Sequence, residues 1–514
     1  VCTLMAALPG LPMVGHGQIE GFREKYGMEY RKAYLDERAD DELVGRHERQ
    51  IFPLLRRRAL FSGVKDFLLY DFFLSSGAVD ENVIAFSNRH EGERCLVVVH
   101  NRFADTAGWV RVSAAYAGEE RAGGPRSLQR QDLGQGLGLR NEPGWFVVFR
   151  DAVSGLEYIR PASELCANGM FIELHAYQTH VFLDFREMAD DAGAHLARLS
   201  AYLQGRGVGS MEEAGREMSL QPLHNAWREL CRTDLLQRQL AVLHDRTGSK
   251  GEGALWLELE EKIGDLFCRA GGNALATGGS QKIIELLLED LLVLWTVLCP
   301  ERGHAQMGAD GMPTAKNILQ MQFKAKAELE RLFLLWLYAQ RLTETGSERR
   351  ADGRSLFAEW LLDGVLVESL RGWGFSESRV DPALRMIRSA CGLRTEIRAC
   401  STELAKTGGS VAAALGQLVK TMARDDDVQA LLQLHRFQND LFFNRENFHW
   451  FCDWLTVQIL WEFHRSAKKE AEDRRQPIAE IMEFFNFLPA LAAKTGFKLE
   501  IFLEKLDQLA AGKE

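Results

Sequence analysis

The sequence has neither a cysteine framework nor an excess of positive charge, and each absence excludes classes of protein. Its nine cysteines are scattered without a C-x-x-C pair, so neither a disulfide framework nor a zinc knuckle is predicted, and a reducing cytoplasm fits best. Lys and Arg number 62 against 72 Asp and Glu, and the net charge of -10 argues against nucleic-acid and anionic-membrane partners. A soluble, cytoplasmic protein is expected.

The sequence also lacks an uninterrupted apolar run long enough to cross a membrane. Its most apolar stretch, residues 283–299, contains Glu285, Glu289 and Asp290, whose charges are costly in lipid. This stretch is predicted to be a buried helix. Residues 1–8 lack the basic start and the cleavage site of a signal peptide.

A change of hydrophobic period along the chain predicts three regions, and the predicted fold class is multidomain α and β. Residues 1–63 combine helical and strand patterns, and residues 64–187 contain eight short segments with the pattern of an antiparallel β-sandwich. The aromatic residues of these strands either fill the core or form a sugar platform, and core packing is the more frequent arrangement. From 188 to 514, leucine-rich amphipathic segments predict an all-α domain of roughly ten helices.

The first region has a helix, strand, loop, helix pattern. "VCTLMAAL" (1–8) predicts the end of an apolar helix, and "LPGLPMVGHGQIEGF" (8–22) predicts a short strand followed by a polar turn. Residues 40–61 predict one amphipathic helix, with acidic residues at its start and arginines at its end. Such a unit has too little surface to be stable alone, so we expect neighbours that residues 1–514 do not contain.

The stretch 8–21 resembles the eighth barrel strand of glycoside hydrolase family 13, the α-amylase family. The matching positions are Pro9, Gly10, Pro12, Gly17 and Gln18. Two departures accompany them, since family members carry aromatic residues in place of Gly15 and His16, and their Glu falls at Ile19, with Glu20 displaced by one position.

The resemblance extends along the chain to residue 187. "RHERQIFPLLRRRALFSGVKDFLLY" (46–70) is similar to the final barrel helix and the start of the C-terminal sandwich, and "VIAFSNRHEGERCLVVVHN" (83–101) is similar to that sandwich's next strands. Residues 1–63 would then be the last strand–helix unit of a (β/α)8 barrel, residues 64–187 the β-sandwich, and residues 188–514 the helical extension of a bacterial subgroup.

The resemblance implies the C-terminal portion of an α-amylase-like glycoside hydrolase. Such enzymes act on α-glucans through a carboxylate nucleophile and an acid about 5 Å apart, and these residues would precede residue 1. One barrel strand cannot present that pair, so no catalytic residue is expected within the chain, and the chain alone is expected to be inactive. The alternative is a non-catalytic helical scaffold or partner-binding module derived from an amylase ancestor.

Three residues are the predicted substrate-binding site, because the resemblance puts them at the mouth of the barrel: His16, Gln18 and Glu20. Their partner would be an α-glucan. For His16, a loop histidine bonded to the backbone is the open alternative. No cofactor and no metal is predicted.

Other motifs favour structural roles. Glu446 and His449 have the Glu-x-x-His spacing of di-iron bundles, but the other such pair, Glu301 and His304, falls in a predicted loop. Core packing is predicted for three tryptophans at helical spacing: Trp450, Trp454 and Trp461. The glycine-rich segment 133–142 is predicted to be a loop rather than a phosphate site.

Overall fold

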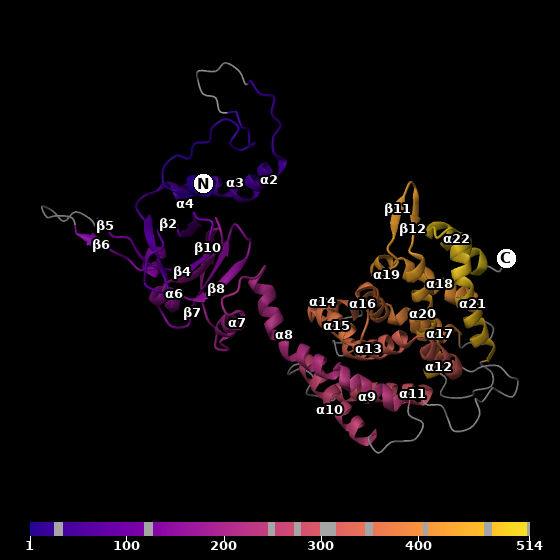
Figure 1. Cartoon of the computed structure of the whole chain (residues 1–514). Coiled ribbons are helices and arrows are strands. Elements are labelled where there is room, and N and C mark those ends of the chain that lie inside the picture. Colours follow the sequence, from indigo (N-terminus) through magenta and orange to yellow (C-terminus); the bar gives the residue numbers. More distant parts are fainter. Residues whose placement is uncertain are drawn as a thin grey trace. The chain divides into compact units, whose positions relative to one another are not determined.

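The computed structural model describes residues 1–24, 34–117, 127–244, 252–271, 279–298, 315–344, 353–404, 410–466 and 475–510. The chain divides into unit 1, Val1–Ser219, and unit 2, Leu220–Glu514. Figure 1 labels their helices and strands, and each unit is described by itself below. The mixed α and β content that the sequence predicts is confirmed.

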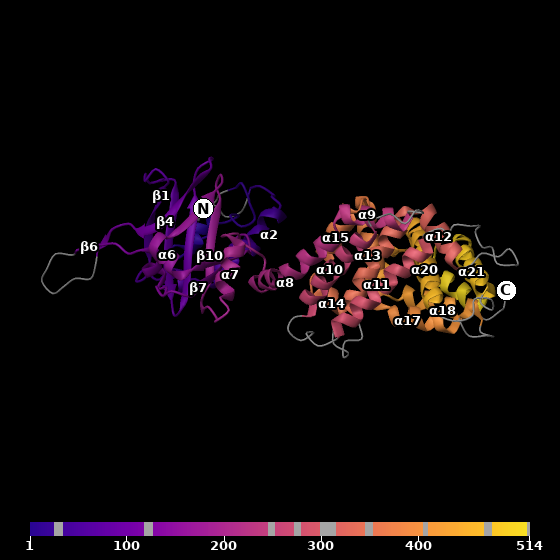
Figure 2. The same ribbon diagram turned by 90° about the horizontal axis from the view of Figure 1, so that it is seen from below.

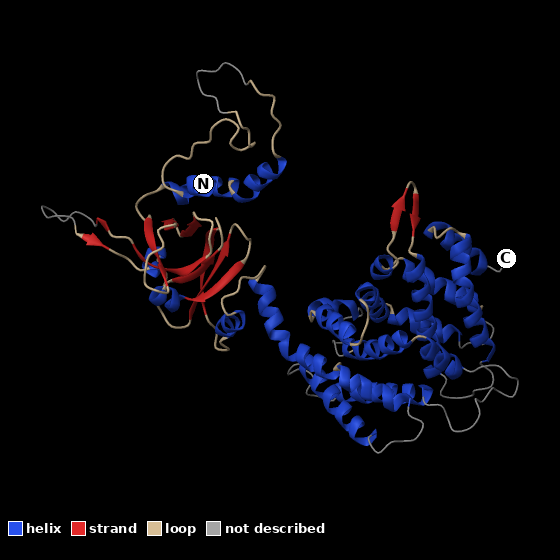
Figure 3. Ribbon diagram, in the orientation of Figure 1, coloured by secondary structure: helices blue, strands red, loops and turns tan. Residues whose placement is uncertain are grey.

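Unit 1 is built on one curled antiparallel sheet of eight strands (Figure 3). Its strands are β1 (Leu68–Leu74), β2 (Val83–His90), β3 (Glu93–His100), β4 (Thr106–Ser113), β7 (Trp145–Asp151), β8 (Glu157–Pro161), β9 (Met170–Leu174) and β10 (Thr179–Ala189). The strand order is β8-β7-β10-β3-β2-β1-β4-β9, which leaves β8 and β9 at the two edges. A separate small pair consists of β5 (Tyr116–Ala117) and β6 (Leu128–Gln129). All eight predicted strand segments are confirmed, but they form one continuous sheet, so the predicted two-layered sandwich is not confirmed.

Helices cover both faces of the curled sheet. On the inner face, α5 (Leu133–Leu137) and α6 (Ala162–Asn168) share a core with Leu96 and Val98 of β3. On the outer face, the alternate residues Val97 and Val99 contact the N-terminal helices. The remaining helices of this unit, α7 (His195–Leu203) and the first half of α8 (Met211–Leu230), cover Phe146 of β7. Because successive strand residues point to opposite faces, both faces are buried.

Four short helices precede the sheet: α1 (Cys2–Ala7), α2 (Asp41–Gln50), α3 (Phe52–Arg56) and α4 (Arg58–Ser62). The single helix predicted over 40–61 is therefore wrong, since breaks occur at Ile51 and Arg57. Pro53, in the first turn of α3, lacks the backbone donor that a continuous helix needs. The helix predicted within residues 1–8 is confirmed as α1. The predicted helix start at Asp40, whose carboxylate accepts from two backbone N–H groups of α2, is also confirmed.

The strand predicted within residues 8–22 is also wrong. This segment contains no strand among its described residues, and it ends in a turn over 16–21. Pro9 and Pro12 lack donors, and a lone strand without a hydrogen-bonded neighbour has little stability. Instead, the Arg58 guanidinium donates hydrogen bonds to the carbonyl oxygens of Ala6 and Gly10 and holds the segment against α4.

The predicted boundary between the sheet and the helical region lies at 187/188, and this division remains a prediction. Two helices that follow it, α7 (His195–Leu203) and α8 (Met211–Leu230), bury Leu199, Leu203 and Met218 against the sheet. The first half of α8 consequently belongs to unit 1.

Unit 2 consists mainly of helices around one apolar core (Figure 2). They are α9 (Thr233–His244), α10 (Glu252–Gly271), α11 (Gly279–Leu298), α12 (Ala315–Ala325), α13 (Ala327–Thr343), α14 (Gly353–Glu359), α15 (Leu362–Gly372), α16 (Glu377–Gly392), α17 (Arg394–Leu404), α18 (Val411–Ala423), α19 (Asp426–Leu431), α20 (Arg445–Ser466), α21 (Arg475–Lys494) and α22 (Leu499–Ala510). The region is not all-α, because β11 (His435–Phe437) and β12 (Asp440–Phe442) form a hairpin.

The centre of unit 2 is α13, which is buried along nearly its whole length and carries an uninterrupted apolar run over 332–339 that faces the core on all sides. The predicted core packing of the α20 tryptophans is confirmed, since Trp454 and Trp461 have no exposed surface and Trp450 is buried. The predicted buried helix at 283–299 corresponds to α11, where Asp290 forms ion pairs with Arg341 and Arg465. No helix in the described ranges is both long and apolar enough to span a bilayer.

Candidate functional site

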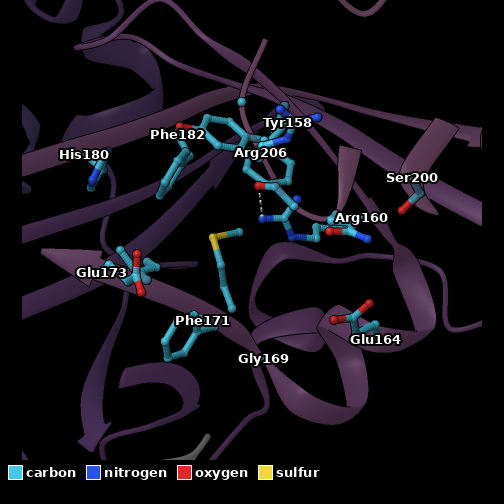
Figure 4. Close-up of a pocket in the computed structure, with 16 residues that line it drawn as sticks. Tyr158, Arg160, Glu164, Gly169, Phe171, Glu173, His180, Phe182, Ser200 and Arg206 are labelled. Carbon is cyan, nitrogen blue, oxygen red and sulfur yellow. Dashed lines mark hydrogen bonds between the residues drawn. The ribbon is translucent and has the colours of Figure 1, made fainter. Parts of the chain in front are cut away.

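A cavity of about 710 Å³ in unit 1 is lined by both edge strands of the sheet, β8 and β9. Residues of β7 and β10, helices α6 and α7, and the loop 204–207 complete its wall. Figure 4 shows Glu173 and His180 on one side of it and Glu164 and Ser200 on the other. A concave site with apolar walls and a few polar groups is the usual form of a small-molecule site.

Aromatic rings form one wall of the cavity. Tyr158 of β8 lies parallel to Phe149 at a centroid distance of 5.7 Å, and Phe182 meets both rings edge-on, at 5.9 Å from Tyr158 and 5.4 Å from Phe149. Phe149 and Phe182 are buried, whereas Tyr158 is half-buried and presents part of its ring to the cavity. These contacts fix the position of the Tyr158 ring.

A second aromatic surface comes from β9. Phe171 lines the cavity and is 46% exposed. Its ring packs on Trp109 of the neighbouring strand β4 at 4.8 Å, a cross-strand pair that holds it in place. Phe171 is thus an exposed, ordered aromatic ring at the cavity.

Charged side chains surround the aromatic rings. Arg160 of β8 donates hydrogen bonds to the carbonyl oxygens of Ile159 and Gly205 at 2.8 and 2.9 Å, and its guanidinium lies 5.9 Å from the Tyr158 ring centre. Arg206, Glu164 and Glu173 also line the cavity, and all three are exposed. They offer donors and acceptors to a polar ligand.

His180 is oriented at the cavity wall by a buried carboxylate. Its Nδ1 lies 3.0 Å from Oδ2 of Asp151, a residue with no exposed surface. Burial would raise the pKa of Asp151, but hydrogen bonds from His180, Ser154 and the Val181 N–H outweigh it, so the pKa is lowered and the carboxylate stays ionised. The Ser154 hydroxyl donates to Asp151 and not to His180. This arrangement orients a histidine, and it is not that of an activated serine nucleophile.

Two glycines shape the loop beside Tyr158. Gly207 has no space for a side chain, because a Cβ atom there would lie 2.6 Å from the Tyr158 ring. Gly205 has φ of +84°, in the left-handed region that favours glycine. The close approach of the loop completes the cavity on the β8 side.

The residues that the sequence predicts as substrate-binding lie elsewhere in unit 1. His16, Gln18 and Glu20 all belong to the turn over 16–21, and none of them lines the cavity. The Gln18 side chain accepts a hydrogen bond from the Gly15 N–H at 2.7 Å, and the His16 ring lies 5.7 Å from the Phe22 ring. Their predicted role in substrate binding stays a prediction.

The segment 133–142, predicted as a loop, contains the short helix α5. Its glycines serve packing, because a Cβ atom at Gly136 would overlap the hydroxyl of Tyr70. The structure therefore gives this segment a place in the core of the curled sheet.

The Glu446 and His449 pair lines a different cavity, of about 470 Å³, in unit 2. Its wall carries an ion pair between Lys326 and Asp453, and Arg379 lies over the Trp450 ring at 4.6 Å. The described residues hold no group of three or more His, Cys, Asp or Glu side chains arranged for a metal ion. The other Glu-x-x-His pair, at 301–304, lies outside the described residues.

The residues that line the cavity of unit 1 were not predicted as a site from the sequence. The available signal was the set of aromatic residues in the strand segments, for which a sugar platform was one of two interpretations. Phe149 and Phe182 are buried, as the core interpretation predicts, whereas Tyr158 and Phe171 present surface to the cavity.

Comparison of the chain with protein-family models, curated proteins and solved structures finds no match. The relationship to glycoside hydrolase family 13 therefore has no support from these comparisons.

Proposed function

We propose that the chain is a glucan-binding, non-catalytic portion of an α-amylase-like protein, and that the cavity of unit 1 holds the sugar. The observation that carries this proposal is the combination of exposed aromatic surface, from Tyr158 and Phe171, with charged side chains at the same cavity. A pyranose ring has an apolar C–H face that packs on aromatic rings, and its hydroxyls need donors and acceptors around that face.

The proposed family and cellular location remain hypotheses from the sequence. The α-amylase resemblance supplies the substrate class, α-glucan, and the unpaired cysteine pattern favours the cytoplasm. The same resemblance proposes that residues 1–63 are the end of a barrel, residues 64–187 a β-sandwich and residues 188–514 a helical extension. No hydrolytic role is assigned to the cavity.

Isothermal titration calorimetry of the full chain with maltoheptaose tests the proposal. The variant Phe171→Ala removes an exposed ring, so the fold should tolerate it. We expect the loss of this ring to cost about 1 kcal/mol of binding free energy, which is about a fivefold loss of affinity. The matched control is Phe437→Ala, since Phe437 is an exposed phenylalanine on β11 of unit 2.

A second pair of exposed aromatic residues, outside the cavity, is the alternative location for the sugar. Phe103 and Tyr177 are 81% and 62% exposed, with ring centres 6.3 Å apart, and neither lines the cavity. If Phe103→Ala weakens binding and Phe171→Ala does not, the proposed site is wrong. Absence of any binding heat with maltoheptaose contradicts the proposed function.

The second candidate function is a helical scaffold or partner-binding module. The hairpin β11–β12 favours it, because Phe437 near its turn is 63% exposed. A binding partner that is lost on Phe437→Ala while maltoheptaose fails to bind would support this alternative.

A further inference from the structure

Four charged side chains line the cavity of unit 1, and none of them forms an ion pair within the described part of the chain: Arg160, Arg206, Glu164 and Glu173. Three of these side chains are exposed, so water solvates their charges at little cost. Arg160 differs because it is half-buried.

The hydrogen bonds of Arg160 leave its charge uncompensated. Its guanidinium donates to the carbonyl oxygens of Ile159 and Gly205, which are dipoles and carry no net charge. Burial lowers the pKa of Arg160, and the nearby Glu164 and Tyr158 only partly oppose this effect. Buried charges in proteins are usually paired, since desolvating a lone charge is costly.

The other charged groups do not supply the missing partner. Glu164 lies near enough to influence Arg160 but beyond ion-pair distance, and Figure 4 shows it beside the cavity as a separate group. Arg206, on the same loop as Gly205, adds a second positive charge, and its Nε donates only to the Leu203 carbonyl oxygen at 3.3 Å. Two guanidinium groups at one wall therefore face the cavity without an acidic partner.

We propose that the ligand of this cavity is a sugar with an anionic substituent, a phosphate or a carboxylate, which binds to Arg160 and Arg206 while the sugar ring packs on Tyr158 and Phe171. This inference rests on the proposed sugar-binding function and narrows its substrate class. Guanidinium groups are well matched to such anions, because their planar donors form two parallel hydrogen bonds with phosphate or carboxylate oxygens. Glu164 and Glu173, as acceptors, take the sugar hydroxyls.

The test is calorimetric titration of the full chain at low salt with glucose, glucose 6-phosphate, glucuronate and inorganic phosphate. We expect glucose 6-phosphate or glucuronate to bind about tenfold more tightly than glucose, because the anionic group adds charge-assisted hydrogen bonds to the arginines. The preferred probe identifies the anionic group. The preference should shrink as salt is added, because ions screen an exposed charge pair.

Variants locate the anion within the cavity. Arg160→Gln should abolish the preference for the anionic sugars over glucose. Arg206→Gln alters an exposed side chain, so it tests the same claim if Arg160→Gln fails to fold, and it should reduce the preference. The matched control is Arg150→Gln on β7, an exposed arginine that does not line the cavity.

The outcomes separate this inference from the proposed function. Equal affinities for glucose and both anionic sugars overturn the inference and leave sugar binding intact. The inference is also wrong if the preference survives both Arg160→Gln and Arg206→Gln. If inorganic phosphate binds as tightly as glucose 6-phosphate and glucose does not bind, the cavity is an anion site without sugar recognition, and both proposals fail.

Discussion

Removal of the Asp151 carboxylate tests how His180 is held at the cavity. Asp151 has no exposed surface, and it accepts hydrogen bonds from these groups: the Val153 N–H, the Ser154 N–H and hydroxyl, His180 Nδ1 and the Val181 N–H. In Asp151→Ala, exposed Ser154 regains water and His180, which lines the cavity, can reach water there, but the Val181 N–H stays in the interior. At about 2 kcal/mol for a buried unsatisfied donor, the expected loss is about 2 kcal/mol of local stability.

Native-state hydrogen exchange of β7 and β10 measures this loss as the free energy of local opening. The matched control is Asp105→Ala, which breaks an exposed pair of the same type, His175 Nδ1 to Asp105 Oδ1 at 3.1 Å. Exposed ion pairs contribute between zero and about 1 kcal/mol, so this control should change little. If Asp151→Ala changes the opening free energy of these strands by less than about 1 kcal/mol, the reasoning is refuted.

Three further predictions concern pH and packing. Because the folded-state pKa of Asp151 is lowered, its stabilisation should be complete above the ordinary value of 3.8 and should fade as the pH falls through the lower folded value. Urea unfolding of the wild type and of Asp151→Ala, followed by circular dichroism at a series of pH values, should therefore show the largest stability difference above pH 3.8 and a shrinking difference below it. Gly136→Ala should destabilise unit 1 by about 1–3 kcal/mol, since the new methyl group overlaps the Tyr70 hydroxyl, and exchange of β1 measures it. Asp290→Ala should cost about 2–3 kcal/mol in unit 2, because buried Arg341 loses its charge-assisted hydrogen bond to Asp290 and keeps only its pair with Glu344, and faster exchange in α11 and α13 measures this loss.

The strands of unit 1 were predictable because their sequence pattern reflects local burial. Segments such as 94–103 contain either alternating or consecutive apolar residues, as expected of strands in a sheet that is covered on both faces. Strand β3 buries Val97 on one face and Val98 on the other. The segment 8–22 has similar apolar residues but no neighbouring strand, so the strand that its pattern predicts does not form. Three of its side chains are exposed as a result: Leu11, Met13 and Val14.

The cavity could not be predicted from local pattern, because it depends on strand order. Phe171 and Tyr158 line one site only because β9 and β8 are the two edges of the sheet, and pairing across the chain decides which strands become edges. The helix break at Arg57 and the hairpin at 435–442 were not predicted either. Both depend on the backbone conformation of a few residues, which does not change the helical spacing of apolar residues. The burial pattern of a sequence predicts its helices and strands, whereas the strand order decides which side chains line the cavity.

Hydrogen exchange of the full chain with and without saturating maltoheptaose tests whether the sugar binds in the cavity of unit 1. We expect slower exchange in peptides that cover 157–173 and 204–207, with no change in residues 8–24 and none in unit 2. Slower exchange confined to the turn that holds His16, Gln18 and Glu20, or to the hairpin of unit 2, would contradict the assignment of the sugar site to the cavity between β8 and β9.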